Sequence, residues 1–268
     1  MNNNKTVLIT GASSGFGYEF SKIFAQNGYD LILVARSEDK LKALAGKLTK
    51  AHGISALVKP KDLFVANAPQ ELYDELKDEN IQVDILINNA GFGNYGKFAE
   101  NNLQDELNLV QLNVATVTHM TRLFVADMVA RRSGKILNVA SLAAFSPGPY
   151  LATYCASKAY VLFLTEAVAE EVASFGVQVM ALCPGVSATG FQATAKNEHS
   201  LIGGNVKALT MPAEEIVEIA YADFMADKVV CIPGTSNRVG NVLMRFIPRT
   251  LIRKGGKKLM YTKELGQK

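Results

Sequence analysis

Apolar residues fall into short continuous runs, separated by longer stretches in which apolar and polar residues mix at helical spacing. The short runs do not alternate with polar residues, as expected of strands that helices cover on both faces. Strands that alternate with helices in this way predict βαβ units and a parallel sheet. The expected strands are residues 6–10, 31–34, 56–58, 85–87, 135–139, 177–182 and 229–232.

Length and composition fit one such domain. With 268 residues, 49% of them hydrophobic, the chain is long enough for one large α/β domain and too short for two ordinary enzyme domains. We predict a doubly wound parallel sheet, a Rossmann fold with helices on both faces, for residues 1–237, and a basic amphipathic extension of the same domain for residues 238–268. Ligands bind such sheets at the carboxyl ends of the strands. The residues expected at these ends are Gly11, Asn88, Ser141 and Pro184.

Several kinds of protein are disfavoured. No apolar run approaches the ~20 residues that span a bilayer, and the first ten residues hold no apolar stretch typical of a signal peptide. We therefore expect a cytoplasmic protein. Three cysteines without a Cys-x-x-Cys pair argue against a disulfide framework and against a zinc site. The three histidines show no ligand spacing, and we expect no metal.

A glycine-rich turn lies between the first expected strand and a helix that should begin near Phe16. Gly11, Gly15 and Gly17 allow backbone amides and a helix N-terminus to face a pyrophosphate. Glycine also marks ordinary strand-to-helix turns, so the turn alone does not establish a dinucleotide site. The residues expected to contact the cofactor here are Gly11, Ser13, Ser14, Gly15, Phe16 and Gly17.

The end of the second strand indicates which dinucleotide is bound. This position carries an acid where a ribose hydroxyl is bound, and an arginine where a 2′-phosphate is bound. Here Arg36 follows Val34 and Ala35, and no acid stands at the strand end. A guanidinium suits phosphate geometry, so NADP(H) is favoured over NAD(H). The alternative is that Arg36 is a solvated side chain at a strand end.

Tyr154 and Lys158 stand four residues apart on a predicted helix, so a phenol and an ammonium point into one site. A free tyrosine has a pKa of about 10, and an adjacent positive charge lowers it. Ser141 lies upstream, after the fifth strand. The glycine-rich turn precedes all three of these residues. The combination indicates a reductase.

Six motifs in order make this sequence resemble the short-chain dehydrogenase/reductase family, from about residue 5 to residue 232. They are the glycine turn, Asn-Asn-Ala-Gly at 88–91, Leu-Asn-Val at 112–114, Ser141, Tyr154 with Lys158, and Pro184 with Gly185. The resemblance implies a carbonyl or secondary-alcohol oxidoreductase with a bound nicotinamide dinucleotide. We also expect a homodimer or homotetramer.

The resemblance also implies roles for single residues. Tyr154 exchanges the proton with the carbonyl, Ser141 hydrogen-bonds the substrate oxygen, Lys158 additionally holds the nicotinamide ribose, and Asn113 anchors a water in the proton relay. The remaining cofactor contacts are Asp62 and Leu63 at the adenine, Asn89, Ala90 and Gly91 near its ribose, and Pro184, Gly185 and Thr189 at the carboxamide side.

The C-terminal part is basic. Between Arg238 and Lys263 there are eight basic residues and no acidic one, in a chain whose net charge is +3. Its apolar residues fall at helical spacing before Pro248, which predicts an amphipathic helix. We expect this helix to pack on its own domain or on a sister subunit; the alternative is contact with anionic lipid or an acidic carrier. Nucleic-acid binding is disfavoured because no recognition module accompanies the charge. The apolar residues are Val239, Val242, Leu243, Phe246 and Ile247.

Two other functions remain as alternatives. Residues 11–15 spell Gly-x-Ser-x-Gly, the nucleophile elbow of serine hydrolases, but that fold needs strands before the elbow and only ten residues precede it here. A dinucleotide sensor without catalysis is the other alternative, because fold alone does not confer chemistry. Residues 142–151 are largely apolar, so we expect a hydrophobic ketone, aldehyde or ketoacyl substrate rather than a sugar. The sequence does not indicate the direction of the reaction or the stereochemistry of the alcohol.

Overall fold

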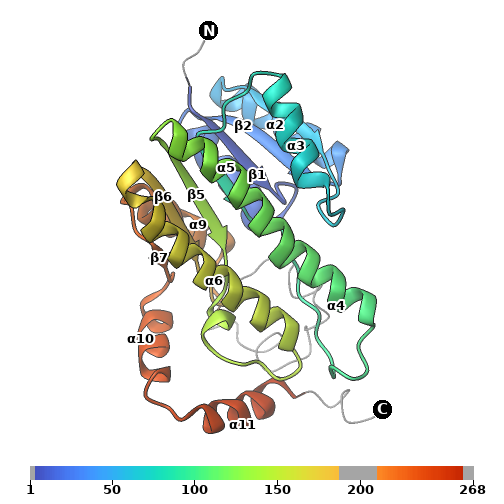
Figure 1. Ribbon diagram of the computed structural model, residues 1–268, viewed down its shortest axis with the longest axis vertical. Coiled ribbons are helices and arrows are strands. Elements are labelled where there is room, and N and C mark those ends of the chain that lie inside the picture. The colour runs from blue at the N-terminus through green and yellow to red at the C-terminus, as the bar shows by residue number, and fades with distance from the viewer. Residues whose placement is uncertain (1–3, 187–209, 262–268) are drawn as a thin grey trace.

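The computed structural model describes residues 4–186 and 210–261, and within them the chain forms one seven-stranded parallel sheet (Figure 1). The strand order is β3-β2-β1-β4-β5-β6-β7, so the order reverses beside β1, between the first and fourth strands. This is the predicted doubly wound Rossmann topology. The strands are β1 (Thr6–Thr10), β2 (Asp30–Ala35), β3 (Ala56–Pro60), β4 (Ile85–Asn88), β5 (Gly134–Val139), β6 (Val177–Leu182) and β7 (Val230–Cys231).

Helices cover both faces of this sheet. On one face lie α1 (Gly15–Gln26), α2 (Glu38–His52) and α9 (Ala213–Met225). On the other lie α3 (Ala68–Asp78), α5 (Val117–Ala130) and α6 (Ala152–Val172). The remaining helices are α4 (Leu103–Val110), the π-helix η1 (Gln111–Thr116), the 3-10 helices η2 (Leu142–Phe145) and η3 (Ala173–Phe175), and α10 (Thr235–Met244) and α11 (Arg249–Met260) near the C-terminus.

Neighbouring residues of one strand enter different cores, which explains the continuous apolar runs. Val7 and Ile9 pack with Phe24 of α1, whereas Leu8 between them packs with Phe124 of α5. All five side chains are buried. Burying a side chain of this size contributes about 1.5–3 kcal/mol, so both helix layers are held to the sheet by the same strands.

A buried polar network crosses the sheet below the ligand-binding edge. The Asn88 amide donates to Asn138 Oδ1 at 2.8 Å and to Thr121 Oγ1 at 3.1 Å, and the Asn138 amide donates to Thr165 Oγ1 at 2.9 Å. These side chains are at most 4% exposed, so their polar groups need one another. Asn88 therefore ties β4 to β5 and α5 inside the protein, and the loop toward the expected crevice begins one residue later.

The C-terminal part of the described chain forms two helices where the sequence predicted one. α10 ends at Met244, so Phe246 and Ile247 lie beyond it, and α11 begins directly after Pro248. Proline disfavours helical backbone in the residue before it, which separates the two helices. The prediction of one helical stripe through Ile247 was therefore wrong in its extent.

Candidate active site

The turn after β1 has the backbone geometry that its glycines allow. Gly11 and Gly15 have φ of +67° and +55°, a region that L side chains rarely adopt. A Cβ on Gly17 would lie 2.3 Å from the Gly11 carbonyl oxygen and 2.6 Å from Asn89 Nδ2. Glycine at position 17 thus lets α1 start directly against this turn.

The loop after β4 is bonded to the glycine turn. Asn89 Nδ2 donates to the Thr10 carbonyl oxygen at 2.8 Å, and Thr10 Oγ1 accepts from the amides of Asn89 and Ala90 at 2.9 and 3.0 Å. β1 and β4 flank the position where the strand order reverses, which is where doubly wound sheets bind ligands. This role of Thr10 was not predicted from the sequence, where the available signal was a hydroxyl at the last strand position before the glycines.

The N-terminus of α1 fits an anion. Ser14 is the N-cap residue, yet its side chain makes no capping hydrogen bond to the first turn. The amides of that turn can therefore point at a phosphate, and the helix dipole favours negative charge there. Ser13 is half-buried in the turn and Phe16 packs against the core, so Phe16 supports the turn through its side chain. The glycine turn and this helix end together fit the pyrophosphate of a dinucleotide.

Arg36 lies near the residues expected at the adenine. Its guanidinium is 5.3 Å from the ring centre of Phe64, and the Asp62 carboxylate accepts from the Phe64 amide at 3.1 Å. Leu63 is buried, and its carbonyl oxygen accepts from Thr116 Oγ1 at 2.8 Å. Phe64, which the sequence analysis did not single out, thus connects the loop after β3 to Arg36. An aromatic residue directly after Asp62 and Leu63 was the available signal.

Tyr154 and Lys158 lie buried on α6, with the Lys158 ammonium 5.8 Å from the centre of the Tyr154 ring. Lys158 Nζ donates to the carbonyl oxygen of Val139, the last residue of β5, at 2.8 Å. Ser141 is the N-cap residue of η2, where its Oγ accepts from the Ala143 amide at 3.1 Å, and its side chain is hydrogen-bonded to Tyr154. The serine, phenol and ammonium are therefore adjacent, as their order in the sequence predicted.

The pKa of Tyr154 differs from the sequence expectation. Burial raises the pKa of the phenol to about 12, and the hydrogen bond with Ser141 opposes that rise by a smaller amount. The lowering of this pKa that the sequence predicted is therefore not found, because burial disfavours the charged phenolate. Burial likewise lowers the pKa of Lys158 to about 8. The resting tyrosine is thus the protonated form, which is the form that can donate a proton.

Asn113 lies in the π-helix η1 and is fully buried. Its Oδ1 accepts from the Phe92 amide at 3.1 Å, and its Nδ2 donates to the Phe92 carbonyl oxygen at 2.9 Å and to Ser157 Oγ at 3.2 Å. A Cβ on Gly91 would be 3.0 Å from Asn113 Oδ1 and 3.5 Å from Lys158 Nζ. Asn113, Gly91 and Lys158 therefore meet, and glycine at 91 leaves the room between them.

Pro184 and Gly185 follow β6 at the same edge of the sheet. The Pro184 carbonyl oxygen accepts from the Leu142 amide at 2.9 Å, and a Cβ on Gly185 would be 2.8 Å from Asn237 Nδ2 of α10. The loops after β5 and β6 are therefore joined, with α10 against them. Thr189, the remaining expected cofactor contact, lies outside the described residues.

Replacing Lys158 by methionine should stabilise the chain near pH 7 in the absence of cofactor. In the wild type, the pKa of Lys158 falls from 10.5 to about 8 on folding, which lowers the free energy of unfolding by about 3 kcal/mol where the lysine is charged in both states. Methionine removes this penalty but also loses the hydrogen bond to Val139, which contributes about 1 kcal/mol. The folded state binds this proton less tightly, so the cost is full below pH 8 and disappears as the pH rises through 10.5. Urea unfolding at pH 7 should show about 2 kcal/mol of added stability, with Lys50→Met on the exposed face of α2 as control. A less stable Lys158→Met protein at pH 7 would contradict this balance.

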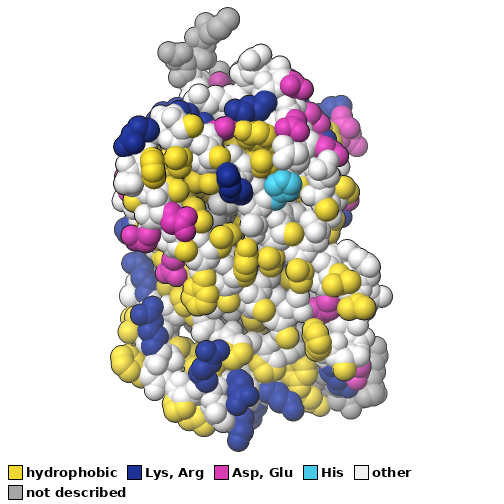
Figure 2. Space-filling model, viewed as in Figure 1, with side chains coloured by type: hydrophobic (Ala, Val, Ile, Leu, Met, Phe, Trp, Pro, Cys, Tyr) yellow, Lys and Arg dark blue, Asp and Glu magenta, His cyan; other side chains and the backbone are white. Residues whose placement is uncertain are grey.

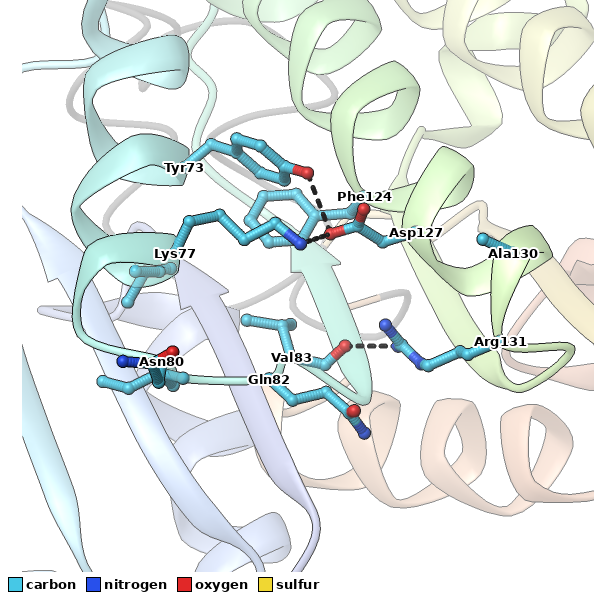
Figure 3. A pocket seen from close by; sticks show the side chains of 11 residues that line it. Tyr73, Lys77, Asn80, Gln82, Val83, Phe124, Asp127, Ala130 and Arg131 are labelled. Atoms are coloured by element: carbon cyan, nitrogen blue, oxygen red, sulfur yellow. Dashed lines mark hydrogen bonds and ion pairs between the residues drawn. The ribbon is translucent and has the colours of Figure 1, made fainter.

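A separate surface pocket of about 470 Å³ lies between α3, α5 and the segment before β4 (Figure 3). In it Asp127 accepts from the Tyr73 hydroxyl at 2.9 Å and pairs with Lys77 at 2.8 Å, while Arg131 donates to the Val83 carbonyl oxygen at 2.6 Å. Val83 precedes β4, so the pocket is at the amino end of that strand, opposite the glycine turn. None of the expected site residues lines it, and we do not assign it to the active site.

In residues 4–186 and 210–261, no three His, Cys, Asp or Glu side chains come together as metal ligands would. Cys155, Cys183 and Cys231 are buried thiols, each with a pKa that burial raises. A raised pKa leaves them uncharged near neutral pH, which does not suit a nucleophile.

Comparisons with known proteins agree with this geometry. Residues 5–200 match the family model described as short chain dehydrogenase. Over 176 residues the chain is 36% identical to a very-long-chain 3-oxoacyl-CoA reductase of Phaeosphaeria nodorum, covering 64% of this chain and 52% of that one. It is 35% identical to a ketoacyl reductase of Nostoc sp. over 187 residues, 69% of this chain and 65% of that one. The chain therefore spans between about half and two thirds of the length of these relatives.

A solved structure covers more of the chain. The short-chain dehydrogenase of Sphingobium yanoikuyae, in complex with NADPH, superposes with a TM-score of 0.80 at 30% sequence identity. The match covers 91% of this chain and 97% of that one. The fold is thus that of a known short-chain dehydrogenase along nearly the whole length of that protein.

Proposed function

The chain belongs to the short-chain dehydrogenase family, and from this premise we propose that it is an NADP(H)-dependent oxidoreductase that interconverts a hydrophobic carbonyl compound and its alcohol. The observation that carries the proposal is the meeting of Ser141, Tyr154, Lys158 and Asn113 beside the glycine turn. A sensor without catalysis would not need this proton-transfer group. The hydrolase alternative loses its basis, because the Gly-x-Ser-x-Gly segment follows β1 and forms the proposed pyrophosphate turn.

The chain's own residues account for the proton. When bound, the nicotinamide supplies or accepts the hydride. In reduction, Tyr154 gives its proton to the substrate oxygen while Ser141 donates a hydrogen bond to that oxygen. A pKa of about 12 keeps the phenol protonated until the oxygen becomes basic. The Lys158 ammonium then stabilises the phenolate that remains, because opposite charges close together in a buried site attract strongly.

The backbone of β5 and the loop after β4 position the lysine. The Val139 carbonyl oxygen accepts from Lys158 Nζ at 2.8 Å, and Asn113 holds the backbone next to Gly91 through both its amide atoms. Short π-helical turns such as η1, which contains Asn113, are frequent at functional sites. We assign Asn113 to positioning of the lysine and of the water of the proton relay.

NADP(H) is the proposed cofactor because Arg36 stands exposed at the end of β2, with its guanidinium over Phe64. A guanidinium can bind a 2′-phosphate with two parallel hydrogen bonds, and stacking on an aromatic ring limits its mobility. The relative of known structure that binds NADPH supports the same choice.

The proposed substrate is a ketone, aldehyde or ketoacyl compound with a bulky apolar part. Apolar and aromatic side chains surround Tyr154, and Tyr150 next to them has φ of +68°, a backbone state that costs a non-glycine residue of order 1–3 kcal/mol. Tyr150 packs against Tyr95 with ring centres 6.2 Å apart, so the strained backbone holds an aromatic wall near the phenol. Relatives that reduce 3-oxoacyl and ketoacyl groups support this substrate class. The apolar side chains around Tyr154 are Phe92, Tyr95, Leu109, Leu151 and Met260.

The test is a screen of bulky ketones, aldehydes and 3-ketoacyl thioesters for NADPH oxidation, with a chromogenic ester assayed in parallel. We expect turnover of at least one apolar carbonyl compound and no ester hydrolysis. Tight NADPH binding without turnover of any carbonyl would favour the sensor instead.

We further propose that the protein is a homodimer or homotetramer assembled through α4 and α6. These helices pack against each other and leave large apolar side chains exposed, with Phe163 67% exposed. Burying a phenylalanine contributes about 1.5–3 kcal/mol, and a two-fold symmetric interface buries it twice, so Phe163→Glu should weaken association at least tenfold. Sedimentation over a concentration series measures this, and Met225→Glu at the end of α9 is the matched control. Unchanged assembly in Phe163→Glu would remove α6 from the interface.

A further inference from the structure

The two C-terminal helices carry an exposed surface in which apolar and basic side chains are mixed, here called the α10–α11 surface. Phe246 is 80% exposed, Leu251 60% and Leu243 59%. Residues 235–261 contain seven basic residues and no acidic one. Figure 2 shows hydrophobic and Lys or Arg side chains gathered at the end of the molecule that α10 and α11 form in Figure 1. Contiguous patches of exposed large apolar residues mark interaction sites.

Both helices are anchored to the domain through groups other than the apolar side chains of this surface. Asn237 Nδ2 donates to the Pro233 carbonyl oxygen at 2.7 Å, and Arg238 Nε donates to the Ile232 carbonyl oxygen at 2.9 Å. At the other end, the Tyr95 hydroxyl donates to the Met260 carbonyl oxygen. The apolar side chains of the α10–α11 surface are thus left facing outward while the helices themselves are held in place.

The arrangement on α11 is that of a helix lying on an interface. Leu251, Gly255 and Leu259 follow one another at four-residue spacing and are exposed, so two leucine side chains with a glycine between them form one strip along α11. Lys254 and Lys258 precede two of these positions by one residue and flank that strip. Apolar residues bounded by lysines match an interfacial helix, in which the apolar side enters hydrocarbon and the ammonium groups reach the headgroups.

We propose that the α10–α11 surface docks on an anionic lipid bilayer. A bilayer offers hydrocarbon to the apolar side chains and a plane of negative charge to the seven cations, each of which adds about fivefold in affinity near such a surface. A second copy of the chain is a poorer occupant, because a symmetric contact would bring the same cations against each other. An acidic protein surface would match the positive charge, but it would not bury apolar side chains as exposed as Phe246, Leu243 and Leu251.

Docking would bring the bilayer next to the active site. Met260, at the end of α11, packs beside Leu151 and Tyr154, and the tilted rings of Tyr150 and Tyr261 have their centres 6.5 Å apart. An apolar carbonyl compound dissolved in the membrane would thus reach the phenol over a short path. Delivery of the substrate from the membrane rests on the proposed function, whereas docking on the bilayer does not.

The test is co-sedimentation of the full chain with phosphatidylcholine vesicles, with and without phosphatidylglycerol, and needs no turnover. We expect at least tenfold tighter binding to the anionic vesicles and loss of most of that difference in high salt. Leu243→Glu with Phe246→Glu, and separately Lys254→Gln with Lys258→Gln, should each weaken binding at least tenfold, whereas Met225→Glu should not. Circular dichroism of each variant verifies folding.

Two results would overturn the proposal. One is equal or absent binding to neutral and anionic vesicles by the wild-type chain. The other is a change of oligomeric state in Leu243→Glu with Phe246→Glu, measured by light scattering without lipid, together with unchanged vesicle binding; it would assign the surface to a second copy. Because sedimentation does not depend on catalysis, a negative carbonyl screen leaves this test intact.

Discussion

Replacing Tyr154 by phenylalanine is expected to lower the rate of carbonyl reduction by about 10²–10⁴, the usual contribution of a positioned acid. The phenol is buried, hydrogen-bonded to Ser141 and close to the Lys158 ammonium. No other described hydroxyl group of α6 has both of these neighbours. The phenylalanine ring fills the same space, so NADPH should still bind. Steady-state turnover together with fluorescence titration of NADPH separates the two effects.

Tyr160→Phe is the matched control. Tyr160 lies on the same helix, but it is 40% exposed and its hydroxyl is bonded to Thr118 Oγ1 at 2.9 Å, away from Ser141. This variant should keep the wild-type rate. If Tyr154→Phe retained more than roughly a tenth of the rate, the assignment of the phenol as the acid would be wrong.

The cofactor preference is expected to reverse when Ala35→Asp is combined with Arg36→Ser. A charge-assisted contact between Arg36 and the 2′-phosphate contributes about 1.5–3 kcal/mol, which predicts a roughly ten- to hundredfold preference of the wild type for NADPH over NADH. A carboxylate at the end of β2 accepts from ribose hydroxyls and repels a phosphate, so both changes act on one contact. The measurement is kcat/KM for both cofactors.

Lys40→Ser is the control for this pair, since it removes an exposed positive charge from the first turns of α2 without touching the strand end. It should leave the preference for NADPH in place. Equal efficiency of the wild type with both cofactors would show that Arg36 is solvated and has no role in the choice.

The sheet was predictable because its strands are buried on both sides. Val7 and Ile9 pack in one core and Leu8 packs in the other, so the sequence of this strand is continuously apolar. Such a run predicts a strand of a parallel sheet that is covered on both faces. β7 is shorter than predicted, at Val230–Cys231, and within the part of the chain that the structure describes it pairs with β6 alone. Because an edge strand is hydrogen-bonded to a neighbour on one side, fewer of its residues form strand pairs than its run of apolar residues predicts.

The main residues of the site were predictable from spacing, but their energetics were not. A four-residue interval on a helix places Tyr154 and Lys158 together whatever the rest of the fold does. Burial of the phenol, which raises its pKa to about 12, depends on residues from other elements that pack around α6. The sequence therefore predicted a neighbouring charge correctly and the net direction of the pKa shift wrongly.

Other parts of the site depend on local backbone that has no simple sequence signature. Helical periodicity places Asn113 on a helix, but the extra residue of the π-helix that directs it toward Phe92 is not visible in an apolar pattern. Thr10 likewise contacts a distant segment, through the backbone amide of Asn89, and Phe64 contacts the guanidinium of Arg36. The sequence predicted a basic amphipathic C-terminal part. The exposure of Phe246 and Leu251 to solvent depends on how α10 and α11 pack on the domain, which the sequence pattern does not indicate.

The most direct test of the central claim follows the hydride itself. NADPH labelled with deuterium at the transferable position of the nicotinamide is incubated with the wild-type chain and a bulky ketone or 3-ketoacyl thioester, and the product is analysed by mass spectrometry. The account predicts an alcohol that carries one deuterium at the former carbonyl carbon, and almost no such product with Tyr154→Phe. Bound NADPH with no labelled alcohol from any carbonyl compound would show that the fold binds the cofactor without using it.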